Sequence, residues 1–482
     1  MTIVDIENIQ PGARDTGHGH ESEPLLSDHP VIVRKEEDNP ASYVGGVFNL
    51  SCTIVGAGIM SLPAAVKEVG IIPGVLLILV SGFLTKYSID LLLRFSDDGR
   101  AYSYAQLMED AFGRVGEMLY QICVLVSVGG TIVVYLIIIA DVVSGSTSSG
   151  VHHSGLLEEW FGEQWWTGRI FVLIFLTAFV LIPTAWIKRM DSLKYTSAIA
   201  VGLAVFFILI VISITVYKLA MGTIEEPAFF PTIDNLPSFL DLFTAVPVVV
   251  IAYQCHFNVH TIQNELEDPT EMQGVVKSTL AVCGTVYIMT GLFGFLLFGD
   301  STASDVLSNF DSNLGVPYSS LINAVVRLSY AAHILLVFPV VFYALRLNFD
   351  GLVFRSAIPL ASDNRRFAST TLGLLLVILL GAICVPSIWV AFQFTGATSG
   401  ALICFIFPAS IALRDRPKIA TKRDEILSWG LISLALFANM VAIYSNVDIE
   451  SSSESDSCVD FNGVKVPLLA QKRASFGSSI FN

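Results

Sequence analysis

Apolar windows of about 20 residues recur along this chain of 482 residues, and they limit what it can fold into. A helix needs about 20 residues to cross the roughly 30 Å hydrocarbon core of a bilayer, where each backbone polar group must find its partner within the protein. Eleven such windows follow one another, at residues 45–66, 71–93, 118–143, 170–187, 193–219, 242–263, 275–298, 321–345, 368–385, 389–413 and 426–444. We therefore expect an all-α polytopic membrane protein with eleven transmembrane helices. The boundary at Pro386-Ser387 is open, because a two-residue turn there fits either two helices or one kinked helix.

The composition agrees with a membrane protein, since 53% of the residues are hydrophobic, 14% are charged and the mean hydropathy is +0.67. The net charge of -15 comes from acids in the tails and in alternate loops, so nucleic acid is not an expected partner. The cysteines show no paired spacing, and we interpret His152-His153 as part of a solvated acidic loop. We expect no metal site and no cofactor. The absence of Walker-type, His-Glu-x-x-His and Gly-x-Ser-x-Gly patterns argues against an enzyme or an ATP-driven pump.

Lysine and arginine predict the orientation, because cytosolic loops of membrane proteins carry them in excess. If the N-terminus is cytosolic, about 18 of them lie in cytosolic segments and about 3 near a membrane end on the other side. We therefore predict a disordered cytosolic tail at 1–40, a transmembrane domain at 41–446, and a lumenal or extracellular tail at 447–482. The first 44 residues lack the apolar stretch of a cleaved signal peptide.

The N-terminal tail contains one pattern typical of a sorting signal. Glu21 stands four residues before Leu25-Leu26, a spacing that resembles the acidic dileucine signals of lysosomal and vacuolar membrane proteins. Short patterns of this kind also occur by chance in ordinary tails. We favour the vacuole, the lysosome or another endomembrane over the plasma membrane.

The first window breaks near its middle. Gly56 and Gly58 lie roughly 17 to 20 Å into a helix that must cover about 30 Å, which is close to the midplane of the bilayer. Irregular backbone at that depth survives only where it is buried in protein or lines a cavity. The alternative is a purely structural role, in which Gly-x-Gly allows close packing of helices. The position of the break indicates the centre of a substrate site.

The sixth window breaks at the same depth, at Tyr253-Gln254-Cys255-His256. Broken helices in corresponding positions of two halves are typical of transporters built from inverted repeats. We predict a 5+5 inverted repeat, with one repeat at about 45–219, the second at about 242–413, and an eleventh helix at about 426–444.

A pair of breaks can bind both ends of a free amino acid. Freed N–H groups at the first break bind a carboxylate, and freed carbonyls at the second accept from an ammonium. The predicted substrate-binding residues are Thr53, Val55, Gly56, Ala57, Gly58, Tyr253, Gln254, Cys255, His256 and Asn258. The windows lack a midplane arginine or lysine, which favours neutral over acidic substrates.

The residues around both breaks resemble those of a known family. The run FNLSCTIVGAGIMSLP at 48–63 is similar to the first-span signature of the amino acid/auxin permease family, especially its sodium-coupled neutral amino acid transporters and its plant and fungal vacuolar amino acid transporters. The Cys255-His256 break and the Asn264-Glu265-Leu266 triplet that follows support the resemblance. It implies a leucine-transporter-like fold and amino acid transport coupled to sodium or protons.

The chain departs from the sodium-coupled pattern at Cys52, where such relatives tend to carry Asn. Leu335 and Val337 stand where they tend to carry hydroxyl residues. A thiol and two aliphatic side chains are poor ligands for a hard cation, which prefers oxygen. Proton coupling, or transport without a coupling cation, is therefore favoured over sodium coupling.

Proton coupling needs a titratable group inside the membrane. His256, His260 and His333 qualify by position, and His256 and His333 are our candidates for ion coupling. The alternative for each is a neutral histidine bonded to a carbonyl of a neighbouring helix. Asp141 and Arg327, near span ends, are expected to pair at an interface rather than to gate.

The sequence thus predicts a secondary active transporter for neutral amino acids, and its expected partners are the amino acid, the proton as coupling ion and membrane lipid. Its rivals are an amino acid sensor with little transport and a sodium-coupled or acidic amino acid carrier. A channel would need a continuous polar lining, whereas the sequence has two local polar breaks, which favour alternating access.

Overall fold

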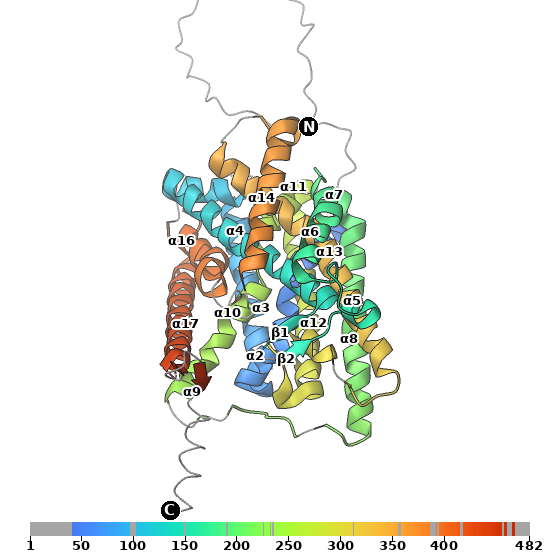
Figure 1. The fold of residues 1–482 in the computed structure, drawn as a ribbon. Coiled ribbons are helices and arrows are strands. Elements are labelled where there is room, and N and C mark those ends of the chain that lie inside the picture. Colours follow the sequence, from blue (N-terminus) through green and yellow to red (C-terminus); the bar gives the residue numbers. More distant parts are fainter. Residues whose placement is uncertain are drawn as a thin grey trace, which may run out of the picture.

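Long helices dominate the part of the chain that this computed structural model describes (Figure 1). The described residues are 41–96, 103–148, 151–188, 191–224, 226–231, 233, 236–311, 313–354, 358–385, 392, 395–414, 418–455, 457–459 and 465–467. The predicted sorting residues Glu21, Leu25 and Leu26 and the boundary at Pro386-Ser387 lie outside them.

The elements of the first half begin with α1 (Tyr43–Ile54), η1 (Ala57–Ser61), α2 (Leu62–Val69), α3 (Ile71–Ser96) and α4 (Tyr104–Ser144). They continue with β1 (Ser146–Ser148), β2 (Val151–His153), α5 (Leu156–Phe161), α6 (Arg169–Leu176), the π-helical turn η2 (Thr177–Leu181), α7 (Ile182–Ala185), η3 (Asp191–Leu193) and α8 (Lys194–Ala220). The strands β1 and β2 form a short antiparallel hairpin.

The second half has α9 (Leu236–Asp241), η4 (Leu242–Thr244), α10 (Ala245–Ala252), α11 (His256–Glu265), η5 (Pro269–Glu271), α12 (Met272–Phe298), η6 (Gly299–Ser301), η7 (Val306–Asp311) and α13 (Ser319–Val353). It ends with η8 (Leu360–Ser362), α14 (Asn364–Cys384), the π-helical turns η9 (Gly396–Gly400) and η10 (Leu402–Ile406), α16 (Phe407–Arg414), α17 (Lys422–Ser455), β3 (Ser457–Val459) and β4 (Lys465–Pro467).

The first span is broken as predicted. Ser42 caps α1 by accepting a hydrogen bond from Gly45 N, and the helix ends at Ile54. Gly56 then has φ -138° and ψ -148°, far from helical values, and the chain resumes as η1 and α2 at an angle of 50° to α1. Pro63 sits in the first turn of α2, where its missing N–H removes no helical hydrogen bond.

The sixth span is broken at the predicted residues. Helix α10 ends at Ala252, Tyr253 to Cys255 are not helical, and α11 begins at His256. The ends of the two broken spans also meet, because Ala41 N donates to Glu265 O at 2.8 Å and Glu267 N donates to Ala41 O at 3.1 Å.

Nine helices of the described residues are long and apolar enough to cross a membrane, and the bent pair of α1 with η1 and α2 makes a tenth. The predicted window at 170–187 corresponds to Arg169–Ala185, a shorter apolar helix interrupted by η2. The count of eleven therefore stays a prediction, while the all-α, multi-spanning architecture is confirmed.

Two helix ends differ from the predicted windows. Helix α4 starts at Tyr104 and kinks at Gly113, so roughly four helical turns precede the apolar window at 118–143. Helix α17 continues to Ser455, past the predicted end at 444, because hydropathy marks only its apolar part and not the polar turns after it. The tail predicted to begin at 447 therefore includes the end of this helix.

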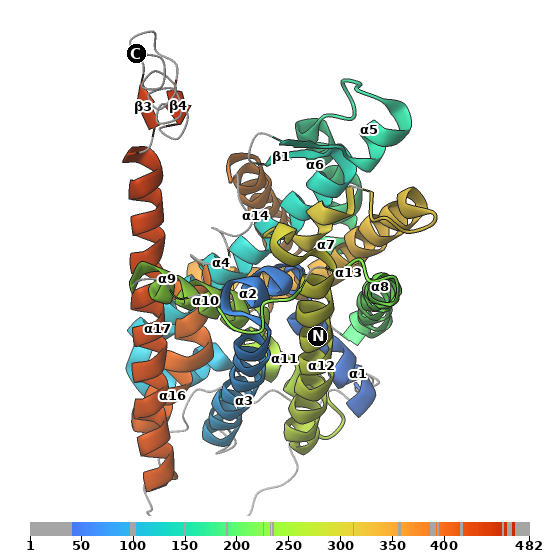
Figure 2. The same ribbon diagram turned by 90° about the horizontal axis from the view of Figure 1, so that it is seen from below.

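The broken helices lie among unbroken ones. Helix α12 packs against α1, α2, α3 and α8, while α13 packs against α4 and α8. Figure 2 shows α2 and α10 close together in the middle and α17 at the edge beside α16, and these two pairs are in contact. Exposed apolar side chains such as Leu76 and Phe83 of α3 and Val377 of α14 face outward, as expected of a surface that meets lipid.

Candidate functional site

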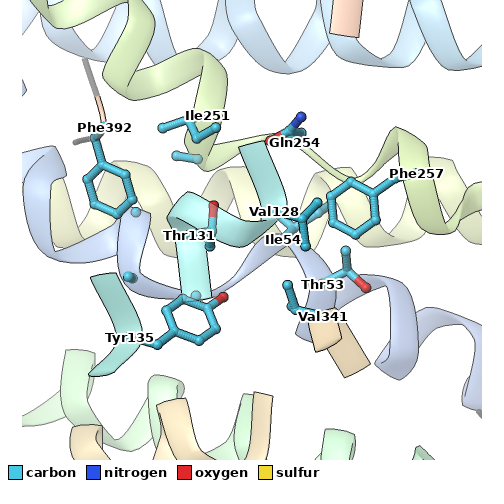
Figure 3. Close-up of a pocket in the computed structure, with 14 residues that line it drawn as sticks. Thr53, Ile54, Val128, Thr131, Tyr135, Ile251, Gln254, Phe257, Val341 and Phe392 are labelled. Carbon is cyan, nitrogen blue, oxygen red and sulfur yellow. The ribbon is translucent and has the colours of Figure 1, made fainter. Parts of the chain in front are cut away.

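A small cavity lies between the two breaks, with α4 as a further wall (Figure 3). Its lining comprises Thr53, Ile54, Gly56, Ala57, Gly58, Val128, Thr131, Tyr135, Ile251, Ala252, Gln254, Phe257, Val341 and Phe392. The room inside is about 20 Å³, enough for a water molecule and too little for an amino acid. Binding of a larger ligand therefore requires the walls to separate.

The glycines of the first break allow two close approaches. A Cβ added at Gly56 would lie 2.2 Å from Tyr135 Oη, and a Cβ added at Gly58 would lie 2.9 Å from Ala252 Cα. Gly56 thus brings the break against α4, and Gly58 brings it against the end of α10. The Gly56 N–H has no hydrogen-bond partner among the described residues, so it is available to a ligand.

Tyrosine hydroxyls meet the freed carbonyls of the breaks. Tyr287 Oη lies 2.6 Å from Ile54 O and 2.6 Å from Ala252 O, and Tyr330 Oη donates to Gly56 O at 2.6 Å. Ile54 and Ala252 are the last residues of α1 and α10, so two helix C-termini, each with partial negative charge, point at one spot.

Polar side chains connect the breaks to each other and to α4. Asn258 Nδ2 donates to Thr53 Oγ1 at 3.0 Å, and Thr53 Oγ1 donates to Asn49 O at 3.0 Å. Ser127 Oγ donates to Gln254 Oε1 at 2.7 Å, while Gln254 Nε2 and Asn258 Oδ1 are buried without a partner among the described residues. Gln254 Nε2 is therefore a donor that a ligand in the cavity could use.

The structure places half of the predicted substrate-binding residues in the lining of this cavity: Thr53, Gly56, Ala57, Gly58 and Gln254. The others lie outside the lining: Val55, Tyr253, Cys255, His256 and Asn258. The Tyr253 ring instead packs edge-on to Tyr287, with ring centroids 5.0 Å apart, because the non-helical turn rotates it away from the cavity.

The sequence reasoning missed the contribution of α4. Val128, Thr131 and Tyr135 line the cavity from this helix, and Ser127 binds Gln254. A signal was present, because Ser127, Thr131 and Tyr135 recur every four residues in an otherwise apolar window and so share one helix face.

The three candidate histidines are buried in different surroundings. His256 Nε2 lies 2.8 Å from Ser88 Oγ of α3, and His333 Nδ1 lies 2.7 Å from Ala200 O of α8. The ring of His333 also adjoins the Val55 backbone at the first break, although its Nε2 makes no hydrogen bond of ordinary geometry. Both ring nitrogens of His260 lack a partner among the described residues.

Residues of the predicted ion-coupling set meet where α1, α8 and α13 join. The Cys52 thiol contacts Ser197 of α8, three residues before the Ala200 carbonyl that His333 faces. Val337 is buried in α13 and Leu335 is half-buried. His333 is thus the polar α13 side chain at this junction.

Charged residues at the end of α4 pair with their neighbours, as expected of an interface. Asp141 forms an ion pair with Arg169. Arg327 of α13 donates to Glu159 Oε1 at 2.7 Å, to Ser154 O at 2.6 Å and to Val142 O at 3.2 Å. In the described part of the chain no group of His, Cys, Asp and Glu side chains is arranged to hold a metal ion.

A family model described as "Transmembrane amino acid transporter protein" matches residues 39–446. The chain is similar to amino acid transporter AVT6B of Arabidopsis thaliana, with 54% identity over 412 residues that cover 85% of this chain and 90% of the relative. It is also similar to amino acid transporter AVT6A of the same plant, with 51% identity over 448 residues that cover 92% and 97%.

A solved structure shares the fold. The crystal structure of MhsT in complex with L-phenylalanine aligns with a TM-score of 0.54 at 13% identity and covers 85% of this chain and 99% of that chain. This likeness confirms the leucine-transporter-like fold that the sequence predicts, and at this identity it concerns the fold alone.

Proposed function

This chain belongs to the transmembrane amino acid transporter family, and on that premise we propose that it carries neutral amino acids across a membrane together with protons. The relatives reported above are named amino acid transporters, so the chain is a transporter and not an enzyme.

The observation that carries the proposal is the pairing of opposite helix poles in one cavity. The N–H groups of Gly56, which caps η1, and of Ala57, its first residue, form a positive pole, and the Ala57 N–H also faces the Tyr135 hydroxyl. The carbonyls of Ile54 and Ala252 end α1 and α10 and form a negative pole. The substrate carboxylate binds the first pole and its ammonium binds the second. No full charge of the protein is needed in the membrane.

Neutral substrates fit the remaining walls. The lining contains no Asp, Glu, Lys or Arg among the described residues, and apolar groups such as Val128, Ile251, Val341 and Phe392 provide much of it. A charged substrate side chain would lose its hydration here without gaining a partner, which costs several kcal/mol by the order of magnitude for buried charges. The alternative, an acidic amino acid carrier, would need a basic side chain to pair with the substrate, and the described lining contains none.

For the proton we propose His333, with His256 as the second candidate. Nδ1 of a neutral His333 donates to Ala200 O, and protonation of Nε2 adds a second donor beside the Val55 backbone. A protonated His333 would then donate hydrogen bonds both to α8 and to the backbone of the first break, whereas the neutral ring donates only to α8. Cys52 at the same junction offers no oxygen to sodium, the alternative coupling ion.

The closed cavity supports an alternating-access mechanism, in which the walls from the broken helices and α4 part on each side in turn. We propose a cytosolic N-terminal tail at 1–40, two inverted repeats at about 45–219 and 242–413, and a vacuolar or related endomembrane. In an acidic compartment the proton gradient would drive amino acids out to the cytosol.

Counterflow exchange in proteoliposomes tests the transport function. Vesicles loaded with one neutral amino acid should exchange it for labelled external substrate, and a panel of neutral, acidic and basic amino acids should rank the neutral ones first. Substrate binding without measurable exchange would identify a sensor instead, and preference for glutamate or aspartate would identify an acidic amino acid carrier.

A further inference from the structure

The two negative helix ends at the breaks share one hydrogen-bond donor. The carbonyl oxygens of Ile54, at the end of α1, and of Ala252, at the end of α10, each lie 2.6 Å from Tyr287 Oη. Tyr287 is completely buried and comes from α12, which is unbroken and packs against α1 and α2. Its ring is fixed further by edge-on contact with Tyr253.

Converging helix C-termini make a place for a cation. Each carries the equivalent of roughly half a negative charge, and the carbonyls of interrupted helices are groups with which membrane transporters coordinate Na⁺. In the interior of the bundle no bulk water screens these ends. The site therefore calls for positive charge or for a donor.

The side chains around this spot do not complete a cation shell. The Cys283 thiol lies near Tyr287 and contacts Ser51, and the Cys52 thiol lies near Cys283. A hard cation prefers several oxygen ligands, and thiols do not replace them. The phenol O–H, by contrast, brings a donor to both carbonyls without a free ion.

We propose that the Tyr287 hydroxyl takes the position of a sodium ion between the two broken helices. It is a positioning residue, since its hydroxyl contacts the carbonyls of Ile54 and Ala252, two residues that line the cavity. This inference rests on the proposed transport function for its uptake assay, and its cation assay is independent of that function. It gives a structural reason why the carrier works without sodium.

The experiment measures uptake of a neutral amino acid and thermal unfolding of the purified protein, each in sodium and in choline. The variants are Tyr287→Phe, which removes the hydroxyl and keeps the ring, and Tyr287→Asn, which opens space and offers an amide oxygen. Tyr120→Phe is the matched control, because Tyr120 is also buried and its ring packs against Tyr104 rather than against Tyr253.

We expect the wild type and Tyr120→Phe to behave alike in sodium and in choline. Tyr287→Phe should lose at least tenfold in kcat/KM in both salts, because both carbonyls lose their donor. Tyr287→Asn should show uptake and an unfolding temperature that rise with sodium concentration. A merely structural role for the hydroxyl would not create that sodium dependence.

Tyr287→Phe with wild-type uptake would overturn the inference, and so would a folded Tyr287→Asn that is indifferent to sodium. Tyr287→Ser repeats the cation test if the Asn variant does not fold. If the wild type moves no amino acid while Tyr287→Asn gains sodium-dependent thermal stability, the proposed function fails and the inference about Tyr287 stands.

Discussion

At the scale of single residues, the site depends on close approaches that only small side chains permit. Gly56 and Gly58 are both in the predicted signature, but they serve different neighbours, Tyr135 of α4 and Ala252 of α10. The Gly-x-Gly pattern therefore combines the two readings that the sequence left open. It packs helices closely, and by doing so it places the free N–H of Gly56 beside the cavity.

Gly56→Ala tests this approach. The added methyl would meet Tyr135 Oη at 2.2 Å, so we expect uptake to fall by roughly five- to 150-fold, which corresponds to overpacking costs of about 1–3 kcal/mol. Adding Tyr135→Phe removes the clashing oxygen and should restore part of the activity. Gly202→Ala is the control, because a Cβ there meets nothing within 4 Å. An active Gly56→Ala variant, or a double variant with no recovery, would contradict this packing.

His333→Gln tests the proton carrier. The amide cannot take up a proton, so pH-dependent accumulation should disappear while counterflow exchange stays measurable. His256→Gln is the comparison, since His256 contacts Ser88 rather than the first break. If only His256→Gln abolishes the pH dependence, the second candidate is the carrier, and unchanged pH dependence in both variants would refute both assignments.

At the scale of elements, the breaks define where helices end and loops close over them. The 3-10 helix η7 contacts η1, so the segment between α12 and α13 reaches the first break. Asp305 directly precedes η7 in this segment, and burial raises the pKa of its carboxyl to about 7. The charge of Asp141 acts in the same direction, while the hydrogen bond from Leu307 N opposes it.

Asp305→Asn should stabilise the protein most above neutral pH. The folded state holds the proton that an unfolded carboxyl releases near pH 4, so stability is lost as the pH rises from about 4 to about 7. The asparagine carries no charge that must be buried. Asp141, Asp311 and Arg327 line the same cavity and are unchanged in this variant. Thermal unfolding should show a larger gain at about pH 8 than at about pH 5.

The exposed Asp300 provides the control for that measurement. Asp300→Asn removes a carboxylate from the preceding turn, but this carboxylate is not buried. An equal shift for Asp305→Asn at both pH values, or destabilisation at the higher one, would show that the buried carboxyl carries no such penalty.

At the scale of the whole molecule, the sequence predicts the spans and their breaks well because the lipid bilayer constrains both. A bilayer demands apolar windows of a fixed length, and it makes a polar or glycine-rich midplane stand out. Windows such as 71–93 and 275–298 therefore agree closely with α3 (Ile71–Ser96) and α12 (Met272–Phe298).

The faces of the helices were harder to predict. A span that is apolar all round gives no periodicity to separate lipid from protein, so Val128 and Val341 could not be assigned to the lining. A break also frees the backbone to rotate, which turned His256 toward α3 and Tyr253 toward α12. The Tyr287 contact joins residues 233 and 35 positions apart and is visible only in the fold.

The N-terminal tail contains the predicted sorting signal, which can be tested by localisation. Leu25→Ala with Leu26→Ala should move a fluorescently tagged protein from the vacuolar membrane to the plasma membrane, because the acidic dileucine pattern with Glu21 is then lost. Ser27→Ala, next to the pattern, is the control. Unchanged localisation of the double variant would show that the tail does not set the address.

The central claim is that protons and not sodium drive amino acid transport through this site. Uptake of a neutral amino acid into proteoliposomes should be measured with a pH gradient at equal sodium, and then with a sodium gradient at equal pH. A proton-driven carrier should accumulate the amino acid above equilibrium with the pH gradient and only equilibrate it with the sodium gradient. Accumulation driven by sodium and indifferent to pH would contradict it.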